Sequence, residues 1–419
     1  MIPDELLDAT FVTVPFLEQR EEAGATVVRN SVLGTRAEGV PGLLAVLRTF
    51  RTPGVLRERL AAGELELEHL MTAVVEGLVM DVDALVATAS PAIGESLKLS
   101  ALLSGTGTPP EVVVFGAPSD TAASGRSGAR HGPGEIRSYC RAPFQERGGE
   151  AMAAPFQLPR GEGERVLLSF EYGRRYRAPA LRVADVGNLR MMPGESIATF
   201  GSRIRWLTGL VLERGAVPVL LGGDHSVTSF ALEALAAGTE DFGIIHFDAH
   251  HDLYPPLAAN FSYVTHANPF TGVLESPRLK RLFQLGLRMS EHVEAGKLRA
   301  DPRVSYVSAR ELQRRSPEQV FAGLDRTLPY YLSFDVDCLD PSIAPETGTP
   351  EPGGLTYYQA LDLVDHASRE FRLLGWDIVE VGQREGLENR AACVAARLLE
   401  QLLLGRMAFE PLGPYLRNP

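Results

Sequence analysis

The chain has 419 residues, a hydrophobic fraction of 45% and a net charge of −12. This composition is ordinary for a soluble globular protein and favours two or three domains. The acidic balance disfavours nucleic acid as the main partner, and the chain lacks the run of about 18 apolar residues that would span a membrane. The start, Met1 to Glu5, lacks the positive charge of a signal peptide, and three scattered cysteines indicate a reducing cytoplasm.

Residues 1–100 are predicted to form a small α+β domain. The stretch 25–33 is typical of a strand, and apolar spacing predicts helices around 43–50, 55–60 and 67–78, followed by a short strand at 78–82. Thr52 and Pro53 are expected to be the N-cap and the first residue of the second helix. This order of elements is typical of a winged-helix module.

Such modules often bind DNA, but the charge of this region argues against that function. Residues 1–90 hold seven arginines and fourteen acidic residues, so 7 − 14 = −7, and a phosphate backbone would be repelled. The layout is also similar to winged-helix elements that hold leader peptides during ribosomal peptide modification, where a strand edge accepts the peptide. The alternative is an extension that packs on the rest of the chain or on a neighbouring subunit.

Residues 91–110 contain serine, glycine and proline and are expected to form a linker. From 111 to 415, short apolar runs alternate with helical patterns. Strands are expected at 111–115, 217–221, 242–247, 281–285, 330–334 and 373–377, and helices at 204–214, 317–324, 357–371 and 391–404. This alternation predicts a three-layer α/β domain, in which helices cover both faces of a parallel sheet. Ligands bind such sheets at the carboxyl ends of the strands.

Three short blocks place candidate metal ligands where expected strands end. The candidates are His225, then Asp248, His250 and Asp252 in an Asp-x-His-x-Asp pattern, and then Asp335 and Asp337. Four carboxylates and two imidazoles are enough to bridge two divalent cations, and ligands without thiolate suit Mn²⁺, Fe²⁺, Co²⁺ or Ni²⁺ better than a structural zinc. Two such ions would share a hydroxide and generate a nucleophile at neutral pH.

These blocks resemble the ureohydrolase family of arginases, agmatinases and related amidinohydrolases. The resemblance covers about residues 111–405 and includes the motifs at 115–118, 125–133, 222–226, 248–252, 333–337 and 377–381. It implies the arginase-like three-layer fold, two Mn²⁺ ions, and hydrolysis of a guanidino group to an amine and urea. It also implies a homo-oligomer, a trimer or a hexamer.

The resemblance implies a role for each matched residue. Asp248 and Asp335 would bridge the two ions; His225 and Asp252 would complete one ion, and His250 and Asp337 the other. Asp252 would also accept a proton from the hydroxide. His266 would shuttle protons to the leaving amine, the alternative being a histidine that merely packs in a loop. Glu380 would hold the substrate guanidinium, whereas His251 would be structural.

The sequence departs from arginases where those enzymes hold the free amino acid. Residues 253–261 are largely apolar, and Met289, Ser290 and Glu291 replace a family Asp-x-Asp. Asn260 and Glu291 are the candidate substrate contacts that remain. We therefore expect arginine side chains of a precursor peptide, bound through residues 1–90, to be converted to ornithine. The alternatives are a small-molecule amidinohydrolase, acting on agmatine or guanidinobutyrate, and a non-catalytic metal-binding regulator.

Overall fold

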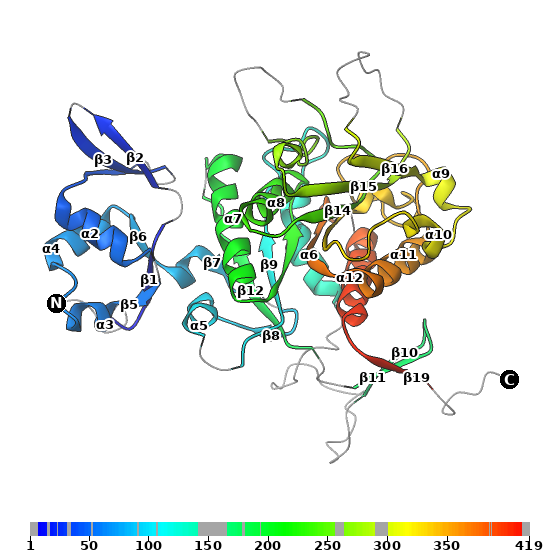
Figure 1. The fold of residues 1–419 in the computed structure, drawn as a ribbon, viewed down its shortest axis with the longest axis horizontal. Coiled ribbons are helices and arrows are strands. Elements are labelled where there is room, and N and C mark those ends of the chain that lie inside the picture. Colours follow the sequence, from blue (N-terminus) through cyan, green and yellow to red (C-terminus); the bar gives the residue numbers. More distant parts are fainter. Residues whose placement is uncertain are drawn as a thin grey trace.

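The computed structural model describes residues 7–14, 17–22, 24–31, 35–51, 53–89, 92–105, 108–140, 166–177, 181–192, 194–255, 264–289, 301–384, 386 and 388–412. Within these ranges, the helices are too short or too polar to cross a membrane. The larger body lies in the middle and right of Figure 1, and a smaller N-terminal lobe lies to its left.

A ten-stranded sheet in the order β16-β15-β14-β17-β18-β13-β9-β12-β7, with β8 also paired to β12, forms the centre of the larger body. Its strands are β7 (Val86–Ala87), β8 (Glu95–Ser96), β9 (Val112–Ala117), β12 (Val183–Leu189), β13 (Val217–Gly222), β14 (Phe242–Phe247), β15 (Leu279–Leu287), β16 (Val304–Ser308), β17 (Tyr330–Asp335) and β18 (Leu373–Val379). The strands from β16 to β12 run parallel, as expected, but β7 is antiparallel to β12. The sheet is therefore mixed at that edge.

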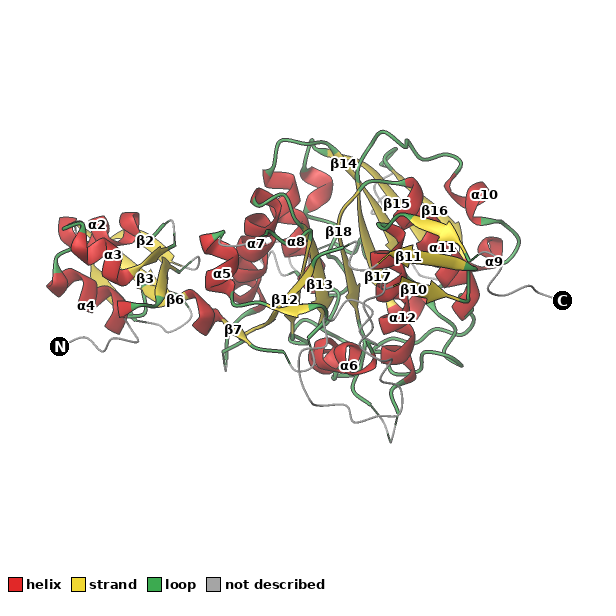
Figure 2. Ribbon diagram, turned by 90° about the horizontal axis from the view of Figure 1, so that it is seen from below, coloured by secondary structure: helices red, strands yellow, loops and turns green. Residues whose placement is uncertain are grey.

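Helices cover both faces of this sheet (Figure 2). One face carries α5 (Leu99–Ser104), α7 (Ile197–Glu213) and α8 (Ser226–Ala237), and the other carries α6 (Gly132–Tyr139), α10 (Pro317–Phe321), α11 (Tyr357–Glu370) and α12 (Arg390–Gly405), with α9 (Ala309–Leu312) beside β15. In β9, Val112 and Val114 join the core on one face, whereas Val113 and Phe115 join the core on the other. This alternation explains why the strand is apolar at every position and confirms the three-layer fold.

The N-terminal lobe has a core of its own, which includes Phe11, Val28, Leu43, Phe50 and Leu70. It contains one sheet of β5 (Gly54–Val55), β1 (Thr10–Thr13) and β6 (Val79–Asp81), a second of β2 (Leu17–Glu22), β3 (Ala25–Asn30) and β4 (Arg36–Glu38), and the helices α2 (Pro41–Thr49), α3 (Leu56–Ala61) and α4 (Leu67–Val75). The expected start of the second helix was wrong. Pro53 precedes the short strand β5 and the helix begins at Leu56, while Thr52 lies outside the described residues.

Residues 91–110 do not form the linker that their composition predicted. They contain β8 and α5, and Leu99, Leu102 and Leu103 are buried in the same core as Phe115. Three apolar side chains on a six-residue helix outweigh the surrounding serine and glycine, because burying each one stabilises the fold by about 1.5–3 kcal/mol. The larger body therefore begins near β7. A further antiparallel sheet of β10 (Val166–Ser169), β11 (Arg174–Arg177) and β19 (Phe409–Pro411) lies outside the central one.

Candidate metal centre

The three predicted ligand blocks meet at the carboxyl edge of the central sheet. His225 follows β13, Asp248 follows β14, and Asp335 is the last residue of β17. Because β14 and β17 are neighbours and β18 alone separates β17 from β13, residues far apart in the sequence come within contact distance. His225, Asp248, Asp252, Asp335 and Asp337 are all buried, and His250 is partly buried.

Two residues at this edge hold an unusual backbone conformation. Among the described residues, the non-glycine residues with positive φ are Asp252 (54°) and Glu380 (61°). Such a conformation costs of the order of 1–3 kcal/mol and persists where the surrounding structure enforces it. Asp252 and Glu380 are both predicted site residues, so the strain lies where the sequence placed the chemistry.

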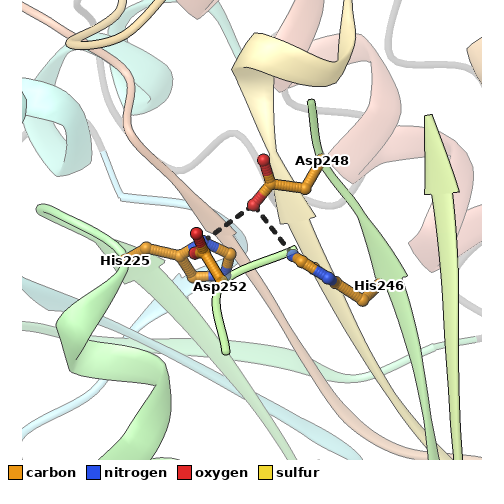
Figure 3. A group of neighbouring side chains, drawn as sticks. All are labelled: His225, His246, Asp248 and Asp252. Atoms are coloured by element: carbon orange, nitrogen blue, oxygen red, sulfur yellow. Dashed lines mark hydrogen bonds and ion pairs between the residues drawn. The ribbon is translucent and has the colours of Figure 1, made fainter. Parts of the chain in front are cut away.

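One group of ligand atoms surrounds the imidazole of His225 (Figure 3). Its Nδ1 lies 2.8 Å from an oxygen of Asp252, 3.2 Å from one of Asp248 and 3.3 Å from one of Asp335. This nitrogen is buried, and it makes no hydrogen bond of acceptable geometry with any residue that the structure describes. A ring nitrogen that faces three carboxylate oxygens is the arrangement expected around a cation.

A second group lies beside the first and shares Asp248 with it. His250 Nδ1 lies 3.1 Å from Asp337 Oδ2 and 3.2 Å from Asp248 Oδ1, whereas the other oxygen of Asp248 faces His225. Thr349 donates its hydroxyl to Asp337 Oδ2 at 3.0 Å. The arrangement fits the bridging role expected for Asp248. The corresponding role of Asp335, whose described contact is with the first group, stays a prediction.

The electrostatics of the two groups also favour bound cations. Burial and the charge of Asp248 raise the pKa of Asp252 to about 7, and burial with the neighbouring acids raises the pKa of Asp335 well above its ordinary value. Burial opposes protonation of His250, but hydrogen bonds to Asp248 and Asp337 raise its pKa to about 12. Four carboxylates in one buried site repel one another, and divalent cations would neutralise them. The residues therefore fit a pair of metal ions.

His266 and Glu380 lie beside the group of ligands around His225. Glu380 Oε1 accepts the backbone N–H of His225 at 2.8 Å, and His266 Nδ1 lies 3.6 Å from the same oxygen. His266 Nε2 accepts the backbone N–H of Ser124 at 3.0 Å and lies 2.6 Å from the Ser124 hydroxyl. Burial opposes protonation of His266, but Glu380 raises its pKa above the ordinary value.

The sequence missed two residues beside the metal groups. His246 belongs to a predicted block but was expected only as part of a strand, and it lies 2.9 Å from Asp248 Oδ2. Ser124 lies directly before the matched motif at 125–133, and the sequence assigned it no role. Asn260 and Glu291, the predicted substrate contacts, lie outside the described residues. His251, expected to be structural, accepts the backbone N–H of Leu253 at 2.9 Å.

Comparison with known proteins identifies this arrangement. A family model described as "Arginase family" matches residues 110–405. The chain belongs to the arginase family. It is 32% identical over 303 residues to a mitochondrial agmatinase of Gallus gallus, and the matched region covers 70% of this chain and 80% of that protein. It is 31% identical over 299 residues to a guanidinopropionase of Pseudomonas aeruginosa, with 70% and 86% covered.

The solved structure of a proclavaminate amidino hydrolase from Streptomyces clavuligerus is similar over 78% of this chain and 98% of that one, with a TM-score of 0.57 and 25% identity. The match includes every predicted ligand block, since all of them fall between residues 110 and 405. This chain is therefore an arginase-family amidinohydrolase, and the resemblance seen in the sequence is confirmed at the level of the family and the fold.

Proposed function

We propose that this arginase-family protein hydrolyses the guanidino group of a small molecule to an amine and urea. The observation that carries the proposal is the position of Asp248, whose two oxygens face two separate groups of buried ligands, with Glu380 beside them. A site built only to hold one ion would not need this sharing. The residues are arranged for a pair of ions next to a carboxylate that can bind a cationic substrate.

Two divalent cations fit this site, and Mn²⁺ agrees best with its oxygen and imidazole donors, with Ni²⁺, Fe²⁺ or Co²⁺ as alternatives. His225, Asp252, Asp248 and Asp335 would hold one ion, and His250 and Asp337 would hold the other together with Asp248 and Asp335. Bound there, the ions would supply Lewis acidity and lower the pKa of water, so that a nucleophile exists at neutral pH.

Glu380 would bind the guanidinium group and orient its carbon for attack. Its Oε1 is fixed by the backbone N–H of His225, which keeps the carboxylate next to the first ligand group. The backbone N–H of Ser124 points at His266 Nε2, so the neutral ring carries its proton on Nδ1. Glu380 faces Nδ1 and raises the pKa of His266, which favours uptake of a second proton. The resulting imidazolium would donate a proton to the leaving amine and return to its neutral form. Asp252 would accept the proton released by the nucleophile.

Support for a small guanidino substrate comes from the relatives, which are named agmatinase and guanidinopropionase. Arg288, at the position before the altered family motif, donates to the backbone carbonyls of Asp337, Leu339 and Glu351. It therefore braces the loop beside the site and is occupied by these contacts. Asn260 and Glu291 stay proposed substrate contacts.

Urea release from a panel of guanidino compounds tests this function. The Mn²⁺-loaded full chain is incubated with agmatine, guanidinobutyrate, guanidinopropionate, arginine and an arginine-containing peptide, and urea is measured. We expect release from at least one small compound, and its loss in Asp248→Asn. A protein that binds two ions and releases urea from none of these substrates would contradict the proposal and favour a non-catalytic metal-binding regulator.

A second candidate substrate is arginine within a precursor peptide, and one observation favours it. Leu67, Met71 and Val75 lie four residues apart on α4 and form an exposed apolar stripe, with side chains 53%, 44% and 70% exposed. An apolar stripe on a lobe of net charge −7 (7 − 14 over residues 1–90) suits a peptide that carries apolar and basic residues. We propose that a winged-helix-like N-terminal domain, which ends before β7 rather than at residue 100, presents this surface ahead of the catalytic domain, which extends to about residue 415.

Mass spectrometry of an arginine-containing precursor peptide tests the second candidate. Each converted arginine gains a water and loses urea, which leaves ornithine. The variant Leu67→Ser/Met71→Ser/Val75→Ser should then process the peptide more slowly while its turnover of a small guanidino compound stays unchanged. Equal slowing of both substrates, or an unmodified peptide, would refute a role of the stripe in substrate delivery.

The cellular setting stays a proposal as well. The three cysteines are free thiols, which suits the reducing cytoplasm. A trimer or hexamer is the assembly that we propose from the family, and light scattering of the purified chain measures it. A monomer in solution would refute that part of the proposal.

A further inference from the structure

Two buried imidazoles, His225 and His246, lie beside Asp248 with their ring centroids 5.1 Å apart. Figure 3 shows both rings turned toward the same carboxylate. By proximity alone, either ring could be a metal ligand, and the ligand-type atoms of His225, His246, Asp248 and Asp252 all lie within 4.8 Å of one another. The partner at the far nitrogen of each ring decides which one offers a lone pair and which one offers a proton.

These partners come from one row of residues across the sheet. Gln284 on β15 pairs with His246 on β14, His246 pairs with Ser333 on β17, and Ser333 pairs with Asp377 on β18. Since paired residues of parallel strands point to the same face, all four side chains lie on one side of the sheet. All four are buried, so their hydrogen bonds must be satisfied within the row and its neighbours.

The His225 ring has its proton on Nε2. The Ser333 hydroxyl donates to Asp377 Oδ1 at 2.7 Å and lies 3.0 Å from His225 Nε2. The other oxygen of Asp377 is occupied by the hydroxyls of Thr228 and Tyr331. Because the serine proton is committed to the carboxylate, its lone pair faces the ring and His225 Nε2 must be the donor. The lone pair of Nδ1 therefore points at the three carboxylates, as a metal ligand requires.

The His246 ring also has its proton on Nε2, but there it faces Asp248. The Gln284 side-chain nitrogen lies 2.7 Å from the backbone carbonyl of His251 and 3.0 Å from His246 Nδ1. A carbonyl can only accept, so this atom must be the amide NH₂, and its second proton goes to Nδ1. With Nδ1 accepting, the neutral ring places its proton on Nε2, 2.9 Å from Asp248 Oδ2.

We propose that His246 is a positioning residue that donates a hydrogen bond to Asp248, and that Gln284 fixes its tautomer and so prevents it from acting as a metal ligand. Holding Oδ2 of Asp248 on one side leaves its two oxygens directed at the two ligand groups. This inference rests on the metal centre of the proposed function, and it adds two residues that the three predicted blocks did not assign.

The variant Gln284→Glu tests the proposal because the two alternatives predict opposite changes. A carboxylate can only accept, so His246 would carry its proton on Nδ1 and turn a lone pair toward Asp248. We expect the affinity of the full chain for Mn²⁺ to fall by roughly 10- to 100-fold, as it does when supporting partners of metal ligands are lost. If His246 were itself a ligand, a carboxylate partner would make the ring more basic and strengthen binding.

The readouts are Mn²⁺ titration monitored by electron paramagnetic resonance and ¹⁵N NMR of the histidine rings, both without substrate. The exposed residue Gln313 gives a matched control, since Gln313→Glu adds the same charge on the surface and should bind Mn²⁺ like the parent. If Gln284→Glu does not fold, Gln284→Met removes the donor without a charge, and we expect weaker Mn²⁺ binding and mixed His246 tautomers.

Tighter or unchanged Mn²⁺ binding by a folded Gln284 variant would overturn the assignment of His246. So would an NMR spectrum of the parent with the His246 proton on Nδ1. A parent chain that binds no Mn²⁺ at all would instead overturn the metal centre of the proposed function, so the two failures are distinguishable.

Discussion

His225 Nδ1 and Asp252 Oδ2 lie 2.8 Å apart, although one residue follows β13 and the other lies in the loop after β14. Asp252 reaches this position through a left-handed backbone conformation, with φ of 54°. His225 is held from the opposite side by Ser333. Both contacts are polar and buried, so the close approach of His225 and Asp252 depends on a strained backbone at Asp252 and on the buried hydroxyl of Ser333.

Removal of metal should destabilise the chain. The buried carboxylates around His225 and His250 repel one another without cations, and an ion present at 100 times its dissociation constant stabilises the native state by about 2.7 kcal/mol. We expect the melting temperature to fall after dialysis against a chelator and to return on adding Mn²⁺. In Asp248→Asn, which loses the shared carboxylate, adding Mn²⁺ should restore little of the lost melting temperature. Equal melting temperatures of the parent with and without metal would contradict the fit of the site to cations.

Glu380→Gln should abolish most of the turnover while it leaves the ions in place. The substitution keeps the shape of the side chain but removes the charge that faces a guanidinium group, and losing one partner of a buried charge pair costs at least about 2 kcal/mol, or roughly 30-fold in kcat/KM. Steady-state kinetics and metal content of the same preparation measure the two effects. A variant with parental kcat/KM would show that Glu380 does not bind the substrate.

Gly348→Val should disturb Glu380 without touching a metal ligand. A Cβ at Gly348 would lie 3.1 Å from Glu380 Oε2 and 3.4 Å from the backbone oxygen of Arg126. Overpacking of this kind costs about 1–3 kcal/mol, and we expect kcat/KM to fall by roughly 5- to 150-fold. Gly272→Ala is the control, because its Cβ would meet nothing within 4 Å. A parental kcat/KM for Gly348→Val would mean that no glycine is needed beside the Glu380 carboxylate.

Arg137→Met should lower the stability of the larger body. Arg137 donates to both oxygens of Asp185 at 2.8 and 2.9 Å, and both side chains are buried. Leaving Asp185 without its cation should reduce the free energy of unfolding by about 3–5 kcal/mol. Arg205→Met, which breaks an exposed pair with Glu233, should cost less than about 1 kcal/mol. Denaturant unfolding measures the free energy of unfolding of both variants. Equal decreases in the two variants would show that burial does not strengthen the contribution of the Arg137–Asp185 pair.

The same Asp185 shows where prediction from sequence reached its limit. Strand β12 contains Asp185, Gly187 and Asn188, so its pattern is not that of a buried strand. Both polar side chains accept hydrogen bonds from Arg137 on α6, and Asp185 also accepts the backbone N–H of Ile93. Strand β7 was hidden for a related reason, since its pairing with β12 joins segments about a hundred residues apart. The apolar strands that end in ligands could be predicted, because the apolar run and the ligand residues after it are close together in the sequence.

The site follows the same division. His225, Asp248 and Asp337 lie one to three residues beyond the ends of apolar strands, and this pattern can be seen in the sequence itself. The role of His246 depends on Gln284, which lies 38 residues away in the sequence and becomes its neighbour only when β14 and β15 pair. A tautomer is decided by contacts across the sheet, and a single sequence does not display those contacts.

We propose that water attacks a guanidino carbon at this site and that urea leaves. Mass spectrometry of the urea formed in water enriched in oxygen-18 measures this directly, with the Mn²⁺-loaded full chain and its best guanidino substrate. We expect the urea to carry one oxygen-18 and the amine product to carry none. Absence of labelled urea from a preparation that holds its metal ions, across the whole panel of guanidino compounds, would contradict hydrolysis of a guanidino group at this site.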